Sequence, residues 1–155
     1  MGHVDFDLKK STRVRLVSCL LIIAFIIPLF GCAAGLTHTQ QREMEGYKAK
    51  RLAVQEKSPG TATALGFFLG CGSFYTRQYA LGFVDLLFWP LSIFWDPING
   101  NRGAHRINYY ATKENVAAEM EEEVKKLDYD LEDNTVTERQ YILKKRRIEQ
   151  KYSVY

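Results

Sequence analysis

Apolar and charged residues in this chain are separated into blocks instead of being mixed along each segment. Apolar residues concentrate in 16–36 and 61–95, and charged residues concentrate in the first dozen positions, in 42–57 and after position 113. The average composition, 46% hydrophobic and 25% charged, conceals this separation. A soluble globule of such length usually alternates the two classes at helix or strand period. The blocks therefore predict that lipid solvates part of the chain, in a mostly α fold whose helices satisfy their own backbone.

The N-terminal block has the layout of a secretory signal. A 15-residue apolar run, 16–30, follows four basic residues: Lys9, Lys10, Arg13 and Arg15. Such bases stay at the anionic cytoplasmic surface while the apolar core enters the bilayer. Pro28 breaks the helix near its end and leaves the next residues extended. We therefore expect residues 1–31 to form a signal peptide or anchor helix.

Positions 29–32, Leu-Phe-Gly-Cys, resemble the bacterial lipoprotein signal, in which a Leu and two small or neutral residues precede a lipidated Cys. The resemblance implies that Cys32 is lipidated and begins the mature chain, which would face the periplasm from a membrane of the cell envelope. Ala33 differs from the Asp that such families use for inner-membrane retention, so the outer membrane is favoured. The alternative is an uncleaved anchor, because the run extended to position 36 has 21 residues and is long enough to span a bilayer.

Residues 32–58 are expected to form the lipidated N-terminus and a polar spacer helix. Thr37 and Gln40 have the spacing of a capping box, and Ser-Pro-Gly at 58–60 is typical of a helix end. Its acids and bases nearly balance, so this helix would lie at the membrane surface or act as a spacer.

Residues 59–97 are predicted to form a short apolar helical hairpin. Its arms, 61–75 and 79–95, are separated by a polar break at 76–78. At about 1.5 Å per residue the arms reach about 22 and 26 Å, whereas the hydrocarbon core is about 30 Å thick. The hairpin could thus span a thin membrane or lie in its interface. Gly66, Gly70 and Gly72 would let the two arms approach closely.

The same stretch resembles the small transmembrane-two hairpin domain. The residues that carry the resemblance are Gly-Cys-Gly-Ser-Phe-Tyr at 70–75, then Gly82 and the run to Trp95-Asp96. In that family a glycine-rich first helix ends in Phe-Tyr and a second helix ends near Trp and Asp. Its members share no established catalytic chemistry, so the resemblance implies a membrane module.

Asp85 is the unusual residue of the second arm, because a carboxylate in hydrocarbon is costly and marks a candidate functional site. One hypothesis is that it faces a partner helix or pairs with Arg77, Arg102 or Arg106. The alternative is that it lies at the wet end of the arm or on the soluble face of a helix that does not span.

A turn at 96–100 and a basic, aromatic connector at 98–111 are expected to follow, with the connector at the lipid headgroups. The charged tail, 112–155, would contain two amphipathic helices. The first would be capped by Thr112 and run to about Leu127. Its apolar stripe has helical spacing and consists of Val116, Ala117, Met120, Val124 and Leu127.

The second tail helix is predicted from about Glu138 to Tyr152, with a capping box formed by Thr137 and Gln140. Residues 131–141, Leu-Glu-Asp-Asn-Thr-Val-Thr-Glu-Arg-Gln-Tyr, and the Lys pair at 144–145 resemble the short C-terminal domain called SHOCT. The resemblance places such a segment at 127–152 and implies oligomerisation or contact with a protein partner.

Several function classes have little support in the sequence. No nucleophile, base and orienting group occur as a set, so we expect no enzyme and no cofactor. The three cysteines lack metal-ligand spacing, and no metal site is predicted. The charged blocks lack interleaved aromatics, which argues against nucleic-acid binding. We expect a membrane-anchored envelope lipoprotein with a scaffolding or assembly role. The alternative is an uncleaved small integral membrane protein that acts as a transporter or channel subunit.

Overall fold

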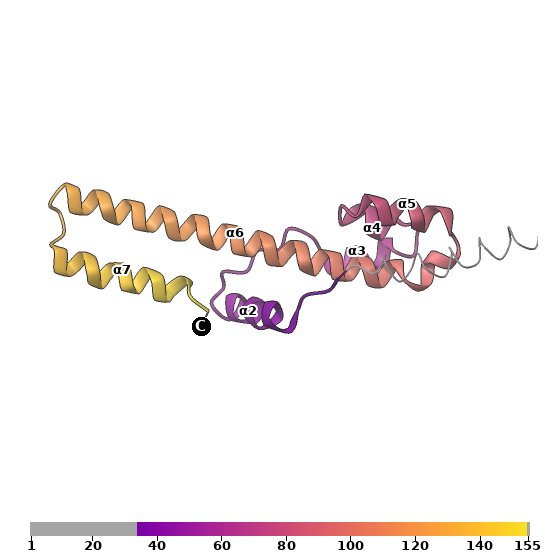
Figure 1. The fold of residues 1–155 in the computed structure, drawn as a ribbon, viewed down its shortest axis with the longest axis horizontal. Helices are drawn as coiled ribbons and strands as arrows, with labels where there is room; N and C mark the ends of the chain where they lie inside the picture. The colour runs from indigo at the N-terminus through magenta and orange to yellow at the C-terminus, as the bar shows by residue number, and fades with distance from the viewer. Residues whose placement is uncertain (1–33, 155) are drawn as a thin grey trace, which may run out of the picture. The chain divides into compact units, whose positions relative to one another are not determined.

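The computed structural model describes residues 34–154, and the mostly α prediction is confirmed over that range. The expected signal peptide at 1–31 and Cys32 lie outside the described residues. Within these residues no helix is both long and apolar enough to cross a membrane. The elements are α2 (His38–Ala49), α3 (Pro59–Leu65), α4 (Cys71–Tyr75), α5 (Tyr79–Leu87), the 3₁₀ helix η1 (Leu91–Phe94), α6 (Asp96–Glu132) and α7 (Glu138–Tyr152) (Figure 1).

The apolar stretch is helical, but each predicted arm is divided into two short helices. The first arm is interrupted between α3 and α4, where Leu69 and Gly70 have φ of 46° and 75°. This left-handed backbone cannot continue a right-handed helix. The second arm is interrupted at Pro90, between α5 and η1, since proline cannot donate the next helical hydrogen bond. The result is a compact set of short helices.

Helix α6 begins at Asp96, so the prediction of a turn at 96–100 is wrong. The segment 98–111, expected as a connector, belongs to this 37-residue helix. Pro97 is tolerated because the first helical turn needs no intrahelical N–H bond. A Cβ at Gly100 would lie 2.8 Å from the Ala62 carbonyl oxygen. This glycine therefore reflects close packing between helices, which the sequence alone does not distinguish from a turn.

The head is the part of the fold formed by residues 59–104, which comprise α3, α4, α5, η1, their connections and the start of α6. Helices α3 and α4 pack on the start of α6, and α5 packs on α4 (Figure 1). Their backbones approach closely. A Cβ at Gly66 would lie 2.4 Å from Pro97 Cα, and one at Gly72 would lie 2.8 Å from the Ala62 carbonyl oxygen. Small residues thus fill the interior of the head, and large apolar ones are left for its surface.

Helix α2 ends at Ala49, and Arg51 has a left-handed φ of 60°, so the prediction that the polar helix continues to Ser-Pro-Gly at 58–60 is wrong. The segment between α2 and α3 is held to α6 by side chains that bond to its backbone. Asn108 Oδ1 accepts from the Lys57 N–H at 2.8 Å, and its Nδ2 donates to the Lys57 carbonyl at 2.7 Å. Thr112 Oγ1 accepts from the Val54 N–H at 2.9 Å. Thr112, expected as a helix cap, therefore lies inside α6, and its hydroxyl binds the neighbouring segment.

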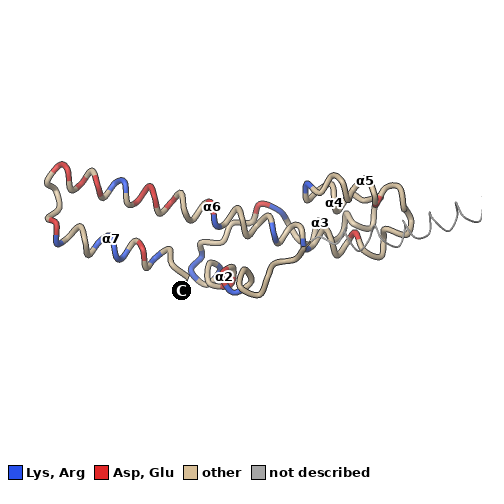
Figure 2. Tube along the Cα trace, viewed as in Figure 1, with Lys and Arg blue, Asp and Glu red and all other residues tan. Residues whose placement is uncertain are grey.

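The tail, formed by residues 112–132 of α6 together with α7, is an antiparallel pair of helices (Figure 1). Tyr47 of α2, Val116 of α6 and Tyr152 of α7 form a buried apolar cluster, with Met120 and Ile148 packed against it. Helix α7 has the predicted bounds, and Thr137 and Gln140 form the predicted capping box. Charged residues follow both tail helices and are sparse over the head (Figure 2).

Candidate functional site

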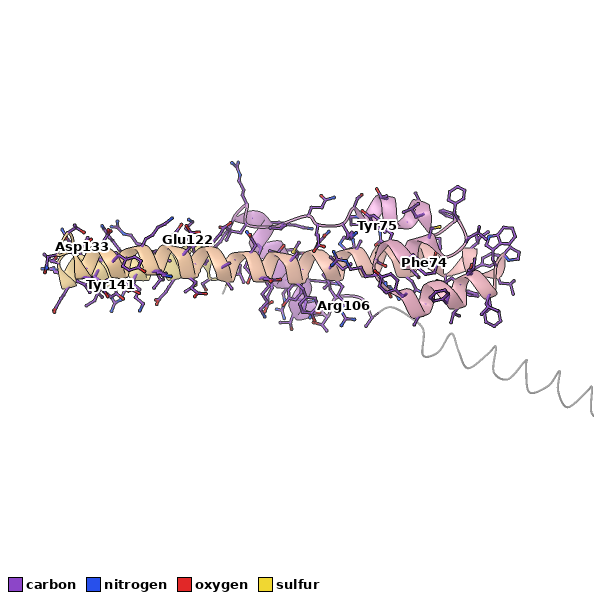
Figure 3. The ribbon with its side chains drawn as sticks, turned by 90° about the horizontal axis from the view of Figure 1, so that it is seen from above. Phe74, Tyr75, Arg106, Glu122, Asp133 and Tyr141 are labelled. Atoms are coloured by element: carbon purple, nitrogen blue, oxygen red, sulfur yellow. The ribbon has the colours of Figure 1, made fainter. Side chains whose placement is uncertain are left out.

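The head exposes large apolar side chains. Among the exposed large hydrophobic residues of 34–154, eleven lie between 67 and 98 and four lie elsewhere. Leu87 and Phe94 are the most open, with exposed fractions of 82% and 78%. Aromatic rings project from the end of the head, beyond the labelled Phe74 (Figure 3). We call the eleven the apolar surface: Phe67, Phe68, Leu69, Tyr79, Phe83, Leu86, Leu87, Trp89, Leu91, Phe94 and Ile98.

Charged side chains are nearly missing from the same stretch. Between residues 59 and 98 the sequence contains three, Arg77, Asp85 and Asp96, and both aspartates are fully buried. Arg77 is exposed and forms an ion pair with Glu56 at 2.6 Å. Large apolar side chains exposed in such number over one part of a fold are typical of surfaces that contact a membrane or another protein.

Asp85 lies inside the head, with an exposed fraction of 0%. Its Oδ1 accepts from Trp95 Nε1 at 2.6 Å, and its Oδ2 lies 2.8 Å from Ser73 Oγ. Asp85 therefore faces a helix of the other arm, as the first hypothesis proposed, because Ser73 belongs to α4. The pairing with an arginine and the solvent-facing alternative are wrong. It binds a hydroxyl and an indole in place of the three arginines, and it lies away from water.

Asp96 is a second buried carboxyl group, which the sequence analysis assigned to a turn. Its Oδ1 accepts from the Ser73 N–H at 2.9 Å and lies 2.5 Å from Ser73 Oγ, and its Oδ2 accepts from the Gly72 N–H at 3.2 Å. The two aspartates are eleven positions apart and come from α5 and α6. Their convergence on Ser73 of α4 follows from the packing of three helices, so periodicity could not predict it.

Hydrogen counting indicates that this carboxyl pair holds a proton. The Ser73 hydroxyl has one hydrogen, but its oxygen lies within hydrogen-bond distance of both carboxyl groups. Both contacts are hydrogen bonds only if one carboxyl group is protonated and donates to Ser73, which then donates to the other. Burial, and then the negative charge of Asp85, raise the pKa of Asp96 to about 6, although hydrogen bonds from Ser73 oppose the shift. The proton belongs to the pair.

The predicted glycines border this pair. Gly70 has a φ of 75°, and a Cβ there would lie 2.9 Å from Asp85 Cβ. Gly72 donates its N–H to Asp96. Gly66 contacts the first turn of α6, where a side chain would overlap Pro97. Gly70 therefore meets the second arm, as predicted, whereas Gly66 meets α6 and Gly72 meets α3 within its own arm.

The carboxyl pair has a structural role, because its hydrogen bonds connect α4, α5 and α6. Neither aspartate is accessible to solvent. Within residues 34–154 no three His, Cys, Asp or Glu side chains are grouped so that they could hold a metal ion. Comparison of the chain with family models, curated proteins and solved structures finds no match. The three resemblances in the sequence stay predictions.

Proposed function

We propose that the protein is a lipid-anchored component of the bacterial cell envelope, with a non-catalytic role as a scaffold or assembly factor. In this proposal Cys32 carries the lipid, the head lies in the membrane interface, and the tail extends into the periplasm. Sorting to the outer membrane follows from Ala33. The observation that carries the proposal is the apolar surface.

The physical argument for membrane contact is the cost of leaving this surface in water. Fully burying a large apolar side chain contributes roughly 1.5–3 kcal/mol, so even partial burial of eleven such chains is a large term. A single acyl chain gives only marginal membrane binding, and a second apolar contact makes it firm. The head would supply that second contact.

The tail supports the scaffolding part of the proposal. Lys151 Nζ bonds to Glu123 at 2.6 Å, and Tyr141 OH bonds to Asp128 at 2.8 Å, which joins the two helices. Ile142 and Leu143 of α7 are half exposed among charged neighbours. This surface would contact a protein partner or a second copy of the chain.

Metabolic labelling with a fatty-acid analogue tests the anchor. We expect wild-type protein and a Cys71→Ala control to be labelled, and Cys32→Ala to lose the label. An intact mass equal to a chain that begins at an acylated Cys32 is expected for the native protein. The mass of the unprocessed 155-residue chain would instead favour the uncleaved channel or transporter subunit.

The two tryptophans allow a direct test of the head, because Trp89 and Trp95 both belong to it. Native protein reconstituted into vesicles with brominated acyl chains should show strong quenching of tryptophan fluorescence. Trp89→Phe should reduce the fraction of tryptophan fluorescence that the brominated chains quench, since Trp89 is half exposed whereas Trp95 is partly buried. Quenching no greater than in vesicles without bromine would contradict the membrane location of the head.

A further inference from the structure

A groove of about 630 Å³ lies between α2, the start of α6 and the segment that precedes α2. Its walls combine apolar and cationic side chains. Leu36 and Met44 are apolar, whereas Lys48, Arg102 and His105 carry nitrogen donors. A ligand that suits such walls has an anionic group attached to an apolar body.

The cations of the groove are available for an anion. Lys48 and Arg102 are exposed, and neither takes part in an ion pair among residues 34–154. Glu45 is the single acid among the lining residues, so the groove has a net charge of +1 with His105 neutral. A phosphodiester has one negative charge, which a guanidinium can bind through two parallel hydrogen bonds.

The face of α6 that enters the groove changes from apolar to cationic along the helix. Ile98, Arg102, His105 and Arg106 are all exposed and recur at positions i, i+4, i+7 and i+8, which share one helix face. Arg102 lies about 6 Å and Arg106 about 12 Å beyond Ile98 along the axis. An apolar residue followed by cations over this distance matches the passage from hydrocarbon to headgroups.

The groove also lies close in sequence to the predicted anchor. Gly35 lines it, and a Cβ at Gly35 would lie 3.7 Å from the Arg102 side chain. Three peptide units separate Gly35 from Cys32, so their Cα atoms can be no more than about 11 Å apart. A lipid attached at Cys32 would therefore keep the groove within reach of the membrane surface.

We propose that this groove binds the headgroup of an anionic phospholipid, with Arg102 and Lys48 on the phosphate and with Leu36 and Met44 against its glyceryl and acyl carbons. The proposal rests on the proposed function, because it names the lipid class that the anchored head would contact. It adds a specific site to the general attraction of the apolar surface for lipid.

Titration calorimetry tests the site on the full-length protein in neutral detergent micelles. We expect short-chain phosphatidylglycerol to bind the wild type at least about tenfold more tightly than short-chain phosphatidylcholine, which corresponds to about 1.4 kcal/mol. The double variant Lys48→Gln, Arg102→Gln should lose this preference. The matched control, Arg139→Gln with Lys145→Gln in α7, removes the same charge away from the groove and should keep it.

Three results would overturn the proposal. The first is a wild type without any preference for the anionic lipid. The second is an α7 control that loses the preference as fully as the groove variant. The third is displacement of the lipid by millimolar inorganic phosphate, which would make the groove a site for free phosphate. Circular dichroism of each variant checks that it folds.

The calorimetric test of the groove can fail or succeed independently of the labelling test of the anchor at Cys32. A Cys32→Ala chain that still prefers phosphatidylglycerol would leave the groove site intact even if labelling shows no lipid on Cys32. A labelled wild-type protein without the preference would remove the groove site and leave the anchor.

Discussion

At the scale of single residues, the Ser73 hydroxyl determines how two buried acids coexist in the head. Its single hydrogen serves one carboxyl group, and a proton on the other carboxyl group completes the second bond. The two acids are therefore hydrogen-bonded inside the head, and their charge is reduced by one compared with two ionised aspartates.

Asn at position 85 keeps the hydrogen-bonding atoms of the side chain but removes the negative charge that faces Asp96. In Asp85→Asn the amide oxygen can accept from Trp95 and the amide N–H can donate to Ser73, so we expect stability close to that of the wild type. Asp85→Ala leaves the indole and the hydroxyl without their partner and should cost about 1–3 kcal/mol. Denaturant unfolding followed by tryptophan fluorescence measures both. Equal destabilisation by Asn and Ala would contradict the shared proton.

The pair also predicts a pH dependence. The folded state raises the pKa of Asp96 from 3.8 to about 6, so the folded protein binds more protons than the unfolded chain between these values. Its contribution to stability is complete below about pH 4 and is lost as the pH rises through about 6. The difference in melting temperature between wild type and Asp85→Asn should therefore change over this range. A constant difference from pH 4 to pH 7 would contradict the assignment.

At the scale of elements, Gly60 in α3 and Gly66 at its C-cap provide a matched pair for testing close packing. A Cβ at Gly66 would lie 2.4 Å from the backbone of Pro97, whereas the nearest atom to a Cβ at Gly60 is 3.9 Å away. Gly66→Ala should therefore destabilise the head by about 1–3 kcal/mol or more through overpacking. Gly60→Ala should be neutral or stabilising, because alanine has the higher helix propensity. Comparable losses in the two variants, measured by thermal unfolding, would argue against this packing.

The start of α7 depends on one local contact. Thr137 Oγ1 accepts from the Gln140 N–H, and Gln140 Oε1 accepts from the Thr137 N–H at 3.0 Å. Thr137→Ala should cost about 1 kcal/mol, whereas Thr137→Ser keeps the hydroxyl and should cost little. Hydrogen exchange at the first amides of α7 reports the loss directly. Unchanged protection in Thr137→Ala would show that packing alone holds this helix end.

The elements that the sequence predicts well are those determined by local rules. Thr137 and Gln140 give the beginning of α7, and Thr37 and Gln40 give the beginning of α2, since a capping box involves only four neighbouring residues. The beginning of α6 was predicted incorrectly, because the proline and glycines at 97–103 also occur in turns. Their helical conformation depends on contacts with α3 and α4, which are distant in sequence.

At the scale of the whole molecule, the apolar block at 61–95 forms most of the head, and the charged block after position 113 forms most of the tail. That lipid solvates the apolar block stays a prediction. The carboxyl pair could not be predicted, because Asp85 and Asp96 meet through three helices. The same holds for Asn108 and Thr112, whose partners lie 51 and 58 positions away. The pattern of the sequence indicates which stretches are apolar and which are charged, and tertiary packing decides which polar side chains meet one another.

The apolar surface and the groove should respond differently to salt. At 1 M salt the Debye length falls to about 3 Å, which weakens contacts between exposed charges but strengthens apolar ones. Quenching of Trp89 by brominated lipid should therefore persist at 1 M sodium chloride, while the preference for phosphatidylglycerol should fall. Loss of quenching in parallel with the preference would show that charge, and not apolar contact, holds the head.

Helix α6 runs without interruption from the head into the tail. With 37 residues it is about 55 Å long, and it has no proline or hinge beyond its first turn. If the head lies in the membrane interface, as we propose, a tilt of this rigid helix by about 10° at the head would move its other end by about 10 Å. The orientation of the head would then set how far from the bilayer the tail can reach for a partner.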